Sequence, residues 1–193
     1  MSDFDALLAR VRACRVCAEH IEPRPVLSLQ PSARLLVIGQ APGRVVHGTG
    51  VPWNDASGLR LRAWLGLDDA TFYDPARVGI LPTGLCFPGT GRSGDLPPRP
   101  ECAPLWHPQI RPHLTALRLT LLIGQYAQAY VLGERRKSSL TETVAAWREY
   151  LPSTICLPHP SPRNRAWLVH NPWFEAELLP ELKTRVAAAL SSS

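Results

Sequence analysis

The sequence lacks the long apolar segments of a membrane-spanning protein. No window approaches the roughly 18 consecutive apolar residues of a transmembrane helix, although hydrophobic residues make up 45% of the chain. The N-terminal segment also lacks an apolar core followed by a cleavage site, which is the pattern of a secretory signal peptide. We therefore expect a soluble, cytoplasmic protein with no membrane partner.

Internal repeats are absent as well, and no low-complexity tract divides the chain. A chain of 193 residues can bury a sizeable core without disulfide bonds. We therefore expect residues 1–193 to form one domain, and we expect this domain to act as a monomer.

The charge balance is basic. Lys and Arg number 21 against 16 Asp and Glu, which gives a net charge of +5 and a pI near 9.2. This balance favours a polyanionic partner such as nucleic acid, but many basic proteins bind none. Five cysteines in a chain expected to be cytosolic speak against a disulfide framework and direct attention to metal-ligand spacing.

Short apolar runs alternate with helical patterns along the chain. The runs predict strands over residues 35–38, 78–81, 119–123 and 154–157. Helical spacing predicts a helix over Ser2–Cys14 capped by Ser2, and further helices over residues 59–65, after Glu101, and over 125–132, 141–149 and 175–190. This alternation is typical of a parallel sheet covered on both faces. The expected fold is α/β, a single-domain three-layer α/β/α sandwich around a short, mostly parallel four-stranded sheet.

The loops that follow the predicted strands form the candidate binding region. Ligands of such sheets bind beyond the carboxyl ends of the strands, which here means the loops after Ile38, Leu81, Ile123 and Leu157. The proline-rich segment over residues 82–112 contains cysteine and aromatic anchors, so we expect an ordered loop and not a disordered linker.

Two loop motifs resemble those of a known family. The first motif resembles that of family 4 uracil-DNA glycosylases, where a GEAPG loop precedes a G-x-P-F element; here it reads Gly39-Gln40-Ala41-Pro42-Gly43, then Gly50-Val51-Pro52-Trp53 and Ser57-Gly58. The second is similar to the loop that enters DNA in the uracil-DNA glycosylase superfamily, above all in its single-strand-selective monofunctional members; here it reads His159-Pro160-Ser161-Pro162-Arg163-Asn164. The resemblance extends from the first cysteine pair to beyond Asn164.

The resemblance implies a site for a base flipped out of DNA. Glycines and Pro42 let backbone N–H groups of the 39–43 loop approach a base carbonyl or a phosphate, although an ordinary strand-to-helix turn has the same composition. Trp53 stands where the family places the aromatic residue that stacks on the base; a packing role is the alternative. His159 is implied as the donor to the base O2 while negative charge develops there, against the alternative of a satisfied loop histidine.

Four cysteines form a candidate metal-binding site. Cys14 and Cys17 are separated by two residues, and Cys86 and Cys102 by fifteen. Four thiolates bind either zinc or an iron–sulfur cluster, and spacing alone does not separate the two. In family 4 the same arrangement holds a 4Fe-4S cluster, so the resemblance implies that cluster here in a structural role, with zinc as the alternative. Cys156 lies in a predicted strand and is expected in the core.

The sequence departs from family 4 at charged and base-reading positions. Gln40, Val46 and His47 replace the acidic residues at the second, eighth and ninth positions of the first motif. Pro82 replaces the asparagine that reads the edge of uracil, which leaves Thr83 or a backbone group as its substitute.

Two residues near the first motif can supply charge instead. Asp55 is a candidate for orienting water or stabilising a positively charged sugar, or it is simply a helix cap. His47 is a candidate base or cation, or it is a solvent-exposed loop histidine.

The expected partner is uracil-containing DNA, single- or double-stranded. Arg44, Arg163 and Arg165 are the candidate phosphate contacts, and Arg163 stands where duplex-acting relatives insert leucine. We interpret the chain as a base-excision repair glycosylase that hydrolyses the bond between DNA and uracil or another deaminated base. The missing carboxylates favour one alternative, a DNA-damage-binding protein of the same fold with weak or no glycosylase activity.

Overall fold

Four parallel strands form the central sheet in the computed structural model, which describes residues 2–92 and 94–191. The order across the sheet is β2-β1-β5-β6, and the strands are β1 (Leu35–Ile38), β2 (Val78–Ile80), β5 (Leu119–Ile123) and β6 (Thr154–Leu157). Three of the four predicted strands have the expected bounds, and β2 ends one residue early. The sheet was expected to be mostly parallel, and within the described residues every strand pair in it is parallel.

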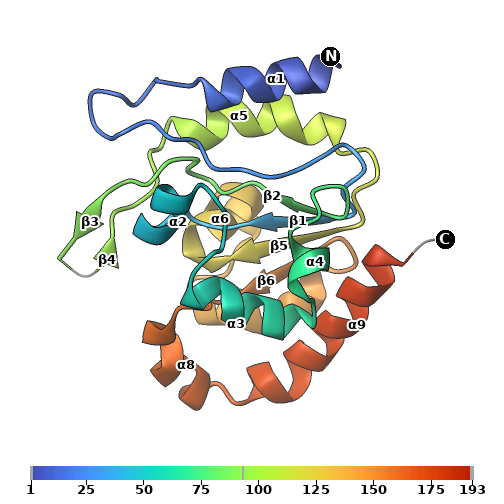
Figure 1. Ribbon diagram of the computed structural model, residues 1–193. Coiled ribbons are helices and arrows are strands. Elements are labelled where there is room, and N and C mark those ends of the chain that lie inside the picture. The colour runs from blue at the N-terminus through green and yellow to red at the C-terminus, as the bar shows by residue number, and fades with distance from the viewer. Residues whose placement is uncertain (1, 93, 192–193) are drawn as a thin grey trace.

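Helices cover both faces of this sheet (Figure 1). They are α1 (Asp3–Arg12), α2 (Arg44–Thr49), α3 (Ala56–Leu65), α4 (Asp69–Phe72), α5 (Cys102–Ile110), α6 (Gly124–Leu132), α7 (Leu140–Ala145), α8 (Arg165–His170) and α9 (Leu179–Leu190). Helix α9 packs on β1 and β5 beside α3, whereas α6 packs on β5 and β6. The connections β1-α3-β2 and β5-α6-β6 run in opposite directions along the sheet, and right-handed crossovers therefore place α3 and α6 on opposite faces. The predicted α/β/α sandwich is confirmed.

The first helix shows how the local sequence sets an element. The Ser2 hydroxyl accepts a hydrogen bond from the Asp5 backbone N–H, and the Asp5 carboxylate accepts one from the Ser2 backbone N–H. This reciprocal cap satisfies N–H groups that have no partner inside the helix. The buried residues recur at helical spacing, namely Phe4, Leu7, Leu8 and Val11. Helix α1 ends at Arg12, two residues before the predicted end.

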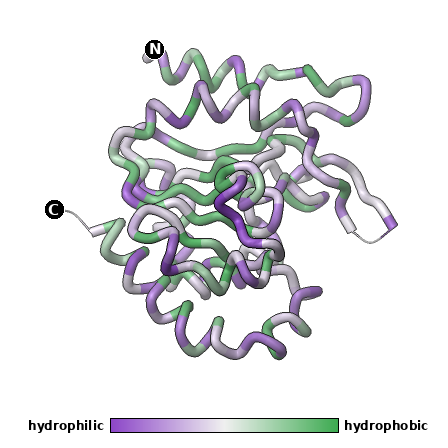
Figure 2. Tube along the Cα trace, turned by 180° about the vertical axis from the view of Figure 1, so that it is seen from behind, coloured by the Kyte–Doolittle hydropathy of each residue, from purple (hydrophilic) through white to green (hydrophobic). Residues whose placement is uncertain are grey.

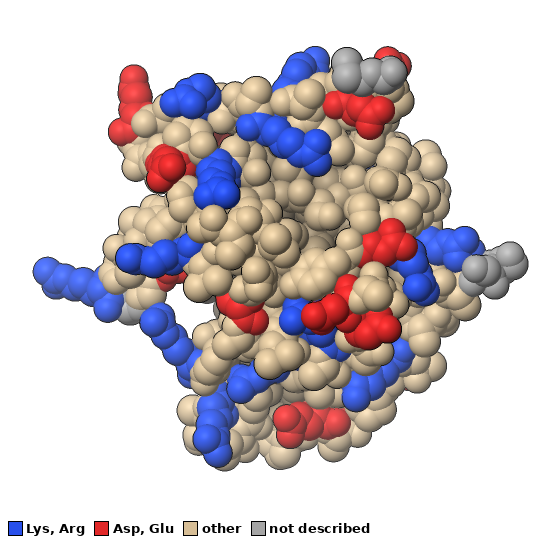
Figure 3. All heavy atoms as spheres, viewed as in Figure 1, with Lys and Arg blue, Asp and Glu red and all other residues tan. Residues whose placement is uncertain are grey.

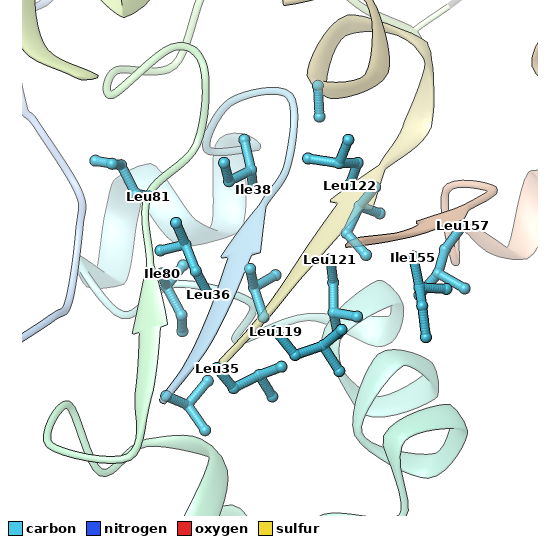
Figure 4. Packing of buried hydrophobic residues seen from close by; sticks show 14 of the residues in the cluster. Leu35, Leu36, Ile38, Ile80, Leu81, Leu119, Leu121, Leu122, Ile155 and Leu157 are labelled. Atoms are coloured by element: carbon cyan, nitrogen blue, oxygen red, sulfur yellow. The ribbon is translucent and has the colours of Figure 1, made fainter. Parts of the chain in front are cut away.

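The core is built on the strands, whose side chains interleave between the two helical layers (Figure 4). The hydrophobic stretches lie at the centre of the fold and the hydrophilic ones on the outer helices and loops (Figure 2). Strands β1 and β5 are buried along their whole length, which explains why they read as continuous apolar runs. Cys156 on β6 is fully buried, as expected, and burial raises its pKa to about 12.

Some elements differ from the predicted ones. The proline-rich segment is ordered, as expected, but it also contains a small antiparallel hairpin formed by β3 (Thr90–Gly91) and β4 (Gly94–Asp95). The helix predicted over 175–190 begins as a wider π-type turn over Phe174–Leu178. Pro180 has no N–H to continue the regular hydrogen-bond ladder, which accounts for that change. Within the described residues, no helix combines the length and apolar character needed to cross a membrane.

Candidate active site

A cavity of about 640 Å³ lies beyond the carboxyl ends of the strands. The segments that follow all four strands contribute to its wall: the 39–43 loop after β1, Pro82 after β2, Gln125 after β5, and His159 after β6. The chain leaves β1 and β5 toward opposite sides of the sheet, and ligands of such sheets bind at this switch in direction. The cavity therefore lies beyond the carboxyl ends of the strands, where the sequence predicted the binding region.

The 39–43 loop is held from behind by Thr83. Its hydroxyl donates hydrogen bonds to the Gly39 and Gln40 carbonyls at 3.2 and 2.7 Å, and its backbone N–H donates to the Gly39 carbonyl. Thr83 is only 4% exposed and is not among the described residues of the cavity wall. Its position suits holding the loop, whereas the sequence had offered it as a base-binding residue.

Trp53 forms one wall of the cavity in a conformation that two glycines permit. Its φ is +56°, and its carbonyl accepts hydrogen bonds from Arg62 Nη1 and the Tyr73 hydroxyl, both at 3.2 Å. A Cβ on Gly58 would lie 1.7 Å from that carbonyl, and a Cβ on Gly39 would lie 2.9 Å from Cζ2 of the indole. Only glycine at these two positions leaves room for the Trp53 carbonyl and for its ring.

His159 lies next to Trp53 in the cavity wall. The two ring centroids are 5.7 Å apart and the planes are tilted by 33°. The Ser161 backbone N–H donates to His159 Nδ1 at 3.2 Å, and the Asn164 side chain donates to the His159 carbonyl at 2.8 Å. Burial lowers the pKa of His159, and the nearby Asp55 and Asp95 oppose this shift in part. The ring is therefore neutral at pH 7, with Nδ1 as an acceptor and Nε2–H as a donor.

The two residues proposed to replace the missing charges are placed differently. Asp55 lines the cavity and also caps α3, because its carboxylate accepts the Gly58 N–H at 2.8 Å. His47 lies 3.2 Å from the Glu22 carboxylate and packs near Phe87, with a side chain that is mostly buried. The described residues of the cavity wall include Asp55 but not His47. Only Asp55 is thus brought into the site.

The second motif forms the opposite rim of the cavity. Ser161, Arg163 and Asn164 line it, Pro160 is buried behind them, and Pro162 begins a short 3₁₀ turn. Arg163 lies against the β3–β4 hairpin, since a Cβ on Gly94 would be 2.8 Å from its Nη1. Lys and Arg side chains gather along this edge of the molecule, over the hairpin and α8 (Figure 3).

Arg165 and Arg44 lie beside this rim. Arg165 begins α8 and is exposed. Arg44 donates to the Thr90 hydroxyl on β3 at 3.2 Å and is not among the described wall residues.

The comparison with known families agrees with this geometry. A family model described as the uracil DNA glycosylase superfamily matches residues 28–183. The chain belongs to this superfamily. Its members are DNA glycosylases, hydrolases that act on DNA in base-excision repair, and the matched range contains both loop motifs. The superfamily prediction is thus confirmed, while the narrower likeness to family 4 remains a resemblance.

Two polar wall residues of this glycosylase fold were not anticipated from the sequence. Gln125 follows Gly124 directly after β5, so the rule about strand ends was a signal that could have found it. Asp95 lies on β4, and its Oδ2 would be 3.3 Å from a Cβ on Gly43. Nothing in the proline- and glycine-rich sequence around Asp95 indicates a contact with the 39–43 loop.

The four predicted cysteine ligands line a second, much smaller cavity of the glycosylase fold, near the end of α1 and the start of α5; they are Cys14, Cys17, Cys86 and Cys102. The Leu85 backbone N–H donates to Cys102 Sγ at 3.3 Å, and burial raises the pKa of that thiol to about 12. In the part of the chain that the structure describes, no three His, Cys, Asp or Glu side chains lie close enough together to surround a single metal ion.

Proposed function

We propose that the chain is a monofunctional glycosylase that hydrolyses the N-glycosidic bond of uracil, or of another deaminated base, flipped into the cavity. The observation that carries the proposal is the pairing of His159 with the Trp53 ring in one cavity. An extruded base needs an aromatic face to replace its stacking neighbours and a donor for the carbonyl on which charge develops. The two side chains provide these functions.

The residues suit a reaction in which the sugar–base bond breaks largely before water attacks. His159 Nε2–H and the backbone amides of the 39–43 loop stabilise the departing base anion, and Trp53 holds its ring in place. Such preorganised donors contribute about 10²- to 10³-fold in rate. The Asp55 carboxylate in the wall stabilises the positive charge that develops on the sugar.

Base selection must differ in detail from that of family 4. Pro82 has no N–H, and its carbonyl accepts a hydrogen bond from His107 Nε2 at 3.1 Å, which fixes that carbonyl to a buried partner. Pro82 therefore does not supply the side-chain amide that reads the edge of uracil in the family. Uracil is our first choice of substrate because of the family resemblance alone. Another deaminated base is the second choice.

We also propose that the four cysteines hold a 4Fe-4S cluster with a structural role. Zinc draws its ligands to about 2.3 Å from a single centre, whereas a four-iron cluster takes one thiolate per iron and keeps the sulfurs farther apart. The four cysteines line one cavity, and the resemblance to family 4 favours the cluster over zinc. It would tie the segment after α1 to the proline-rich segment and α5.

A single-turnover assay tests the proposed activity. Enzyme in excess is mixed with single-stranded or duplex DNA that carries one uracil, and the products are treated with hot alkali. Strand cleavage at the uracil after alkali, with none before it, supports a monofunctional glycosylase. DNA that is retained by the protein but never cleaved supports the alternative, a damage-binding protein, which the replacement of the motif carboxylates by Gln40, Val46 and His47 favours.

A further inference from the structure

A carboxylate reaches the cavity from an element outside both loop motifs. Asp95 ends strand β4 of the small hairpin and lies over Gly43, with 3.3 Å between its Oδ2 and the place of a Cβ on that glycine. Asp95 and Asp55 both act electrostatically on His159, so two negative charges lie near the ring that faces the base. The hairpin thus places a carboxylate beside the first motif. In that motif, Gln40, Val46 and His47 occupy the positions that are acidic in family 4.

The side chain of Gln40 holds this segment in place. Its Nε2 donates to the Leu96 carbonyl at 3.1 Å, one residue after Asp95, and the Leu96 N–H donates to the Gly89 carbonyl at 2.9 Å. Gln40 occupies the position where family 4 carries an acidic residue. An amide can donate this hydrogen bond and a carboxylate cannot, so Gln40 positions a carboxylate from another element instead of supplying its own.

The two aspartates of the wall are not equivalent. The Asp55 carboxylate accepts the Gly58 N–H as the cap of α3, which commits one of its oxygens to the helix. Among the described residues, none forms a hydrogen bond or an ion pair with the Asp95 carboxylate. A carboxylate that faces a cavity without such a partner is free to accept a proton from water.

We infer that Asp95 is the general base of the hydrolysis, with Gln40 as its positioning residue; this inference rests on the proposed function. The bond between the base nitrogen and C1′ breaks, and its electron pair leaves with the base. A water oxygen then bonds to C1′ and passes one proton to the Asp95 carboxylate. That proton afterwards returns through solvent to the base anion, so one water is consumed and a free base and an abasic sugar are formed.

Replacement of Asp95 provides the test. Asp95→Asn keeps the shape but cannot accept the proton, and we expect single-turnover excision of uracil to slow by about 10²- to 10⁴-fold. The dependence of rate on enzyme concentration should show unchanged DNA affinity. Asp95→Ala should recover part of its rate when sodium formate is added, because formate is a small carboxylate that fits the vacated space. Asp3→Asn on α1 makes the same charge change outside the cavity and should leave the rate unchanged.

Gln40→Met tests the positioning role. It removes the donor to Leu96, and we expect it to slow the wild type but not the Asp95→Asn variant, since the two changes act on one group. An Asp95→Asn rate within twofold of the wild type overturns the inference, as does an Asp95→Ala variant that formate does not restore. A wild-type protein that excises no base overturns the proposed function itself, so the two failures are distinguishable.

Discussion

The Ser161 backbone N–H donates a hydrogen bond to Nδ1 of His159, and this contact decides which ring nitrogen carries the proton. Because Nδ1 accepts, the neutral ring holds its proton on Nε2 and can donate it to a base carbonyl. The contact lies within the second motif, where Ser161 and His159 are two residues apart. The motif therefore sets the tautomer of the histidine as well as its place.

Ser161→Pro removes this N–H while keeping the backbone shape, because the φ of Ser161 is −58° and suits proline. We expect the single-turnover rate to fall by about tenfold, the value of one hydrogen bond. Ser161→Ala is the matched control, since it keeps the N–H and removes only the hydroxyl. Equal rates for the two variants would show that the N–H does not set the tautomer.

Arg163→Ala should impair excision from paired uracil more than from single-stranded uracil. Only the duplex requires a base to be unpaired, at a cost of a few kcal/mol, and Arg163 projects from the stiff rim of the cavity against the hairpin. His159→Ala should instead slow both substrates by the same factor, because the leaving base is the same. Single-turnover rates on both substrates distinguish insertion of Arg163 into the duplex from a phosphate contact. An equal loss for Arg163→Ala would make that residue a phosphate contact only, and its removal would then lower the salt dependence of binding.

His107 should make folding sensitive to mild acid. It is 1% exposed, and burial lowers its pKa to about 4 from 6.5. Between these values the unfolded chain binds a proton that the folded chain does not, so the stability present above pH 6.5 is lost as the pH falls toward 4, by about 3 kcal/mol.

Denaturant unfolding at several pH values measures this loss. His107→Gln does not titrate and keeps an N–H for the Pro82 carbonyl, and it should show a flatter pH dependence than the wild type. Parallel curves for the two proteins would contradict the assignment. His159, whose pKa is also lowered, contributes equally to both curves.

The metal content of the purified protein tests whether the four cysteines hold a 4Fe-4S cluster. We expect iron and acid-labile sulfide, a brown colour, and lower stability for Cys14→Ser and Cys102→Ser, because cluster binding is linked to folding. Cys156→Ser is the comparison, since this buried cysteine lies in the core on β6 and should leave the iron content unchanged. Zinc without iron would show that the four thiolates bind zinc, and it would overturn the proposed 4Fe-4S cluster.

The strands and the location of the cavity could be predicted because they depend on local patterns. Strands β1 and β5 are short, continuously apolar and buried on both faces, so composition alone marks their ends. Because the strands were expected to be parallel, their carboxyl ends place the binding loops at one edge of the sheet. The cap on α1 could be predicted for a similar reason, since Ser2 and Asp5 are three residues apart.

The side-chain roles depended on contacts between distant parts of the chain. Gln40 and Leu96 are 56 residues apart, and their hydrogen bond brings Asp95 to the cavity. Thr83 points to the carbonyls behind the 39–43 loop, and His47 to Glu22, because of how the loops pack. No periodicity in the sequence encodes those directions, so the resemblance identified the loops but did not place every residue on the cavity wall.

We propose that this cavity hydrolyses the bond between a deaminated base and its sugar, and this activity can be measured by identifying the released base. Wild-type protein and His159→Ala, each in excess, are incubated with duplexes that carry one uracil, hypoxanthine or xanthine, and the free base is identified by mass spectrometry. We expect free base from the uracil duplex, an intact strand before alkali, and release about 10²- to 10³-fold slower from His159→Ala. Wild-type protein that binds all three duplexes and releases no base from any of them would be a damage-binding protein and not a glycosylase.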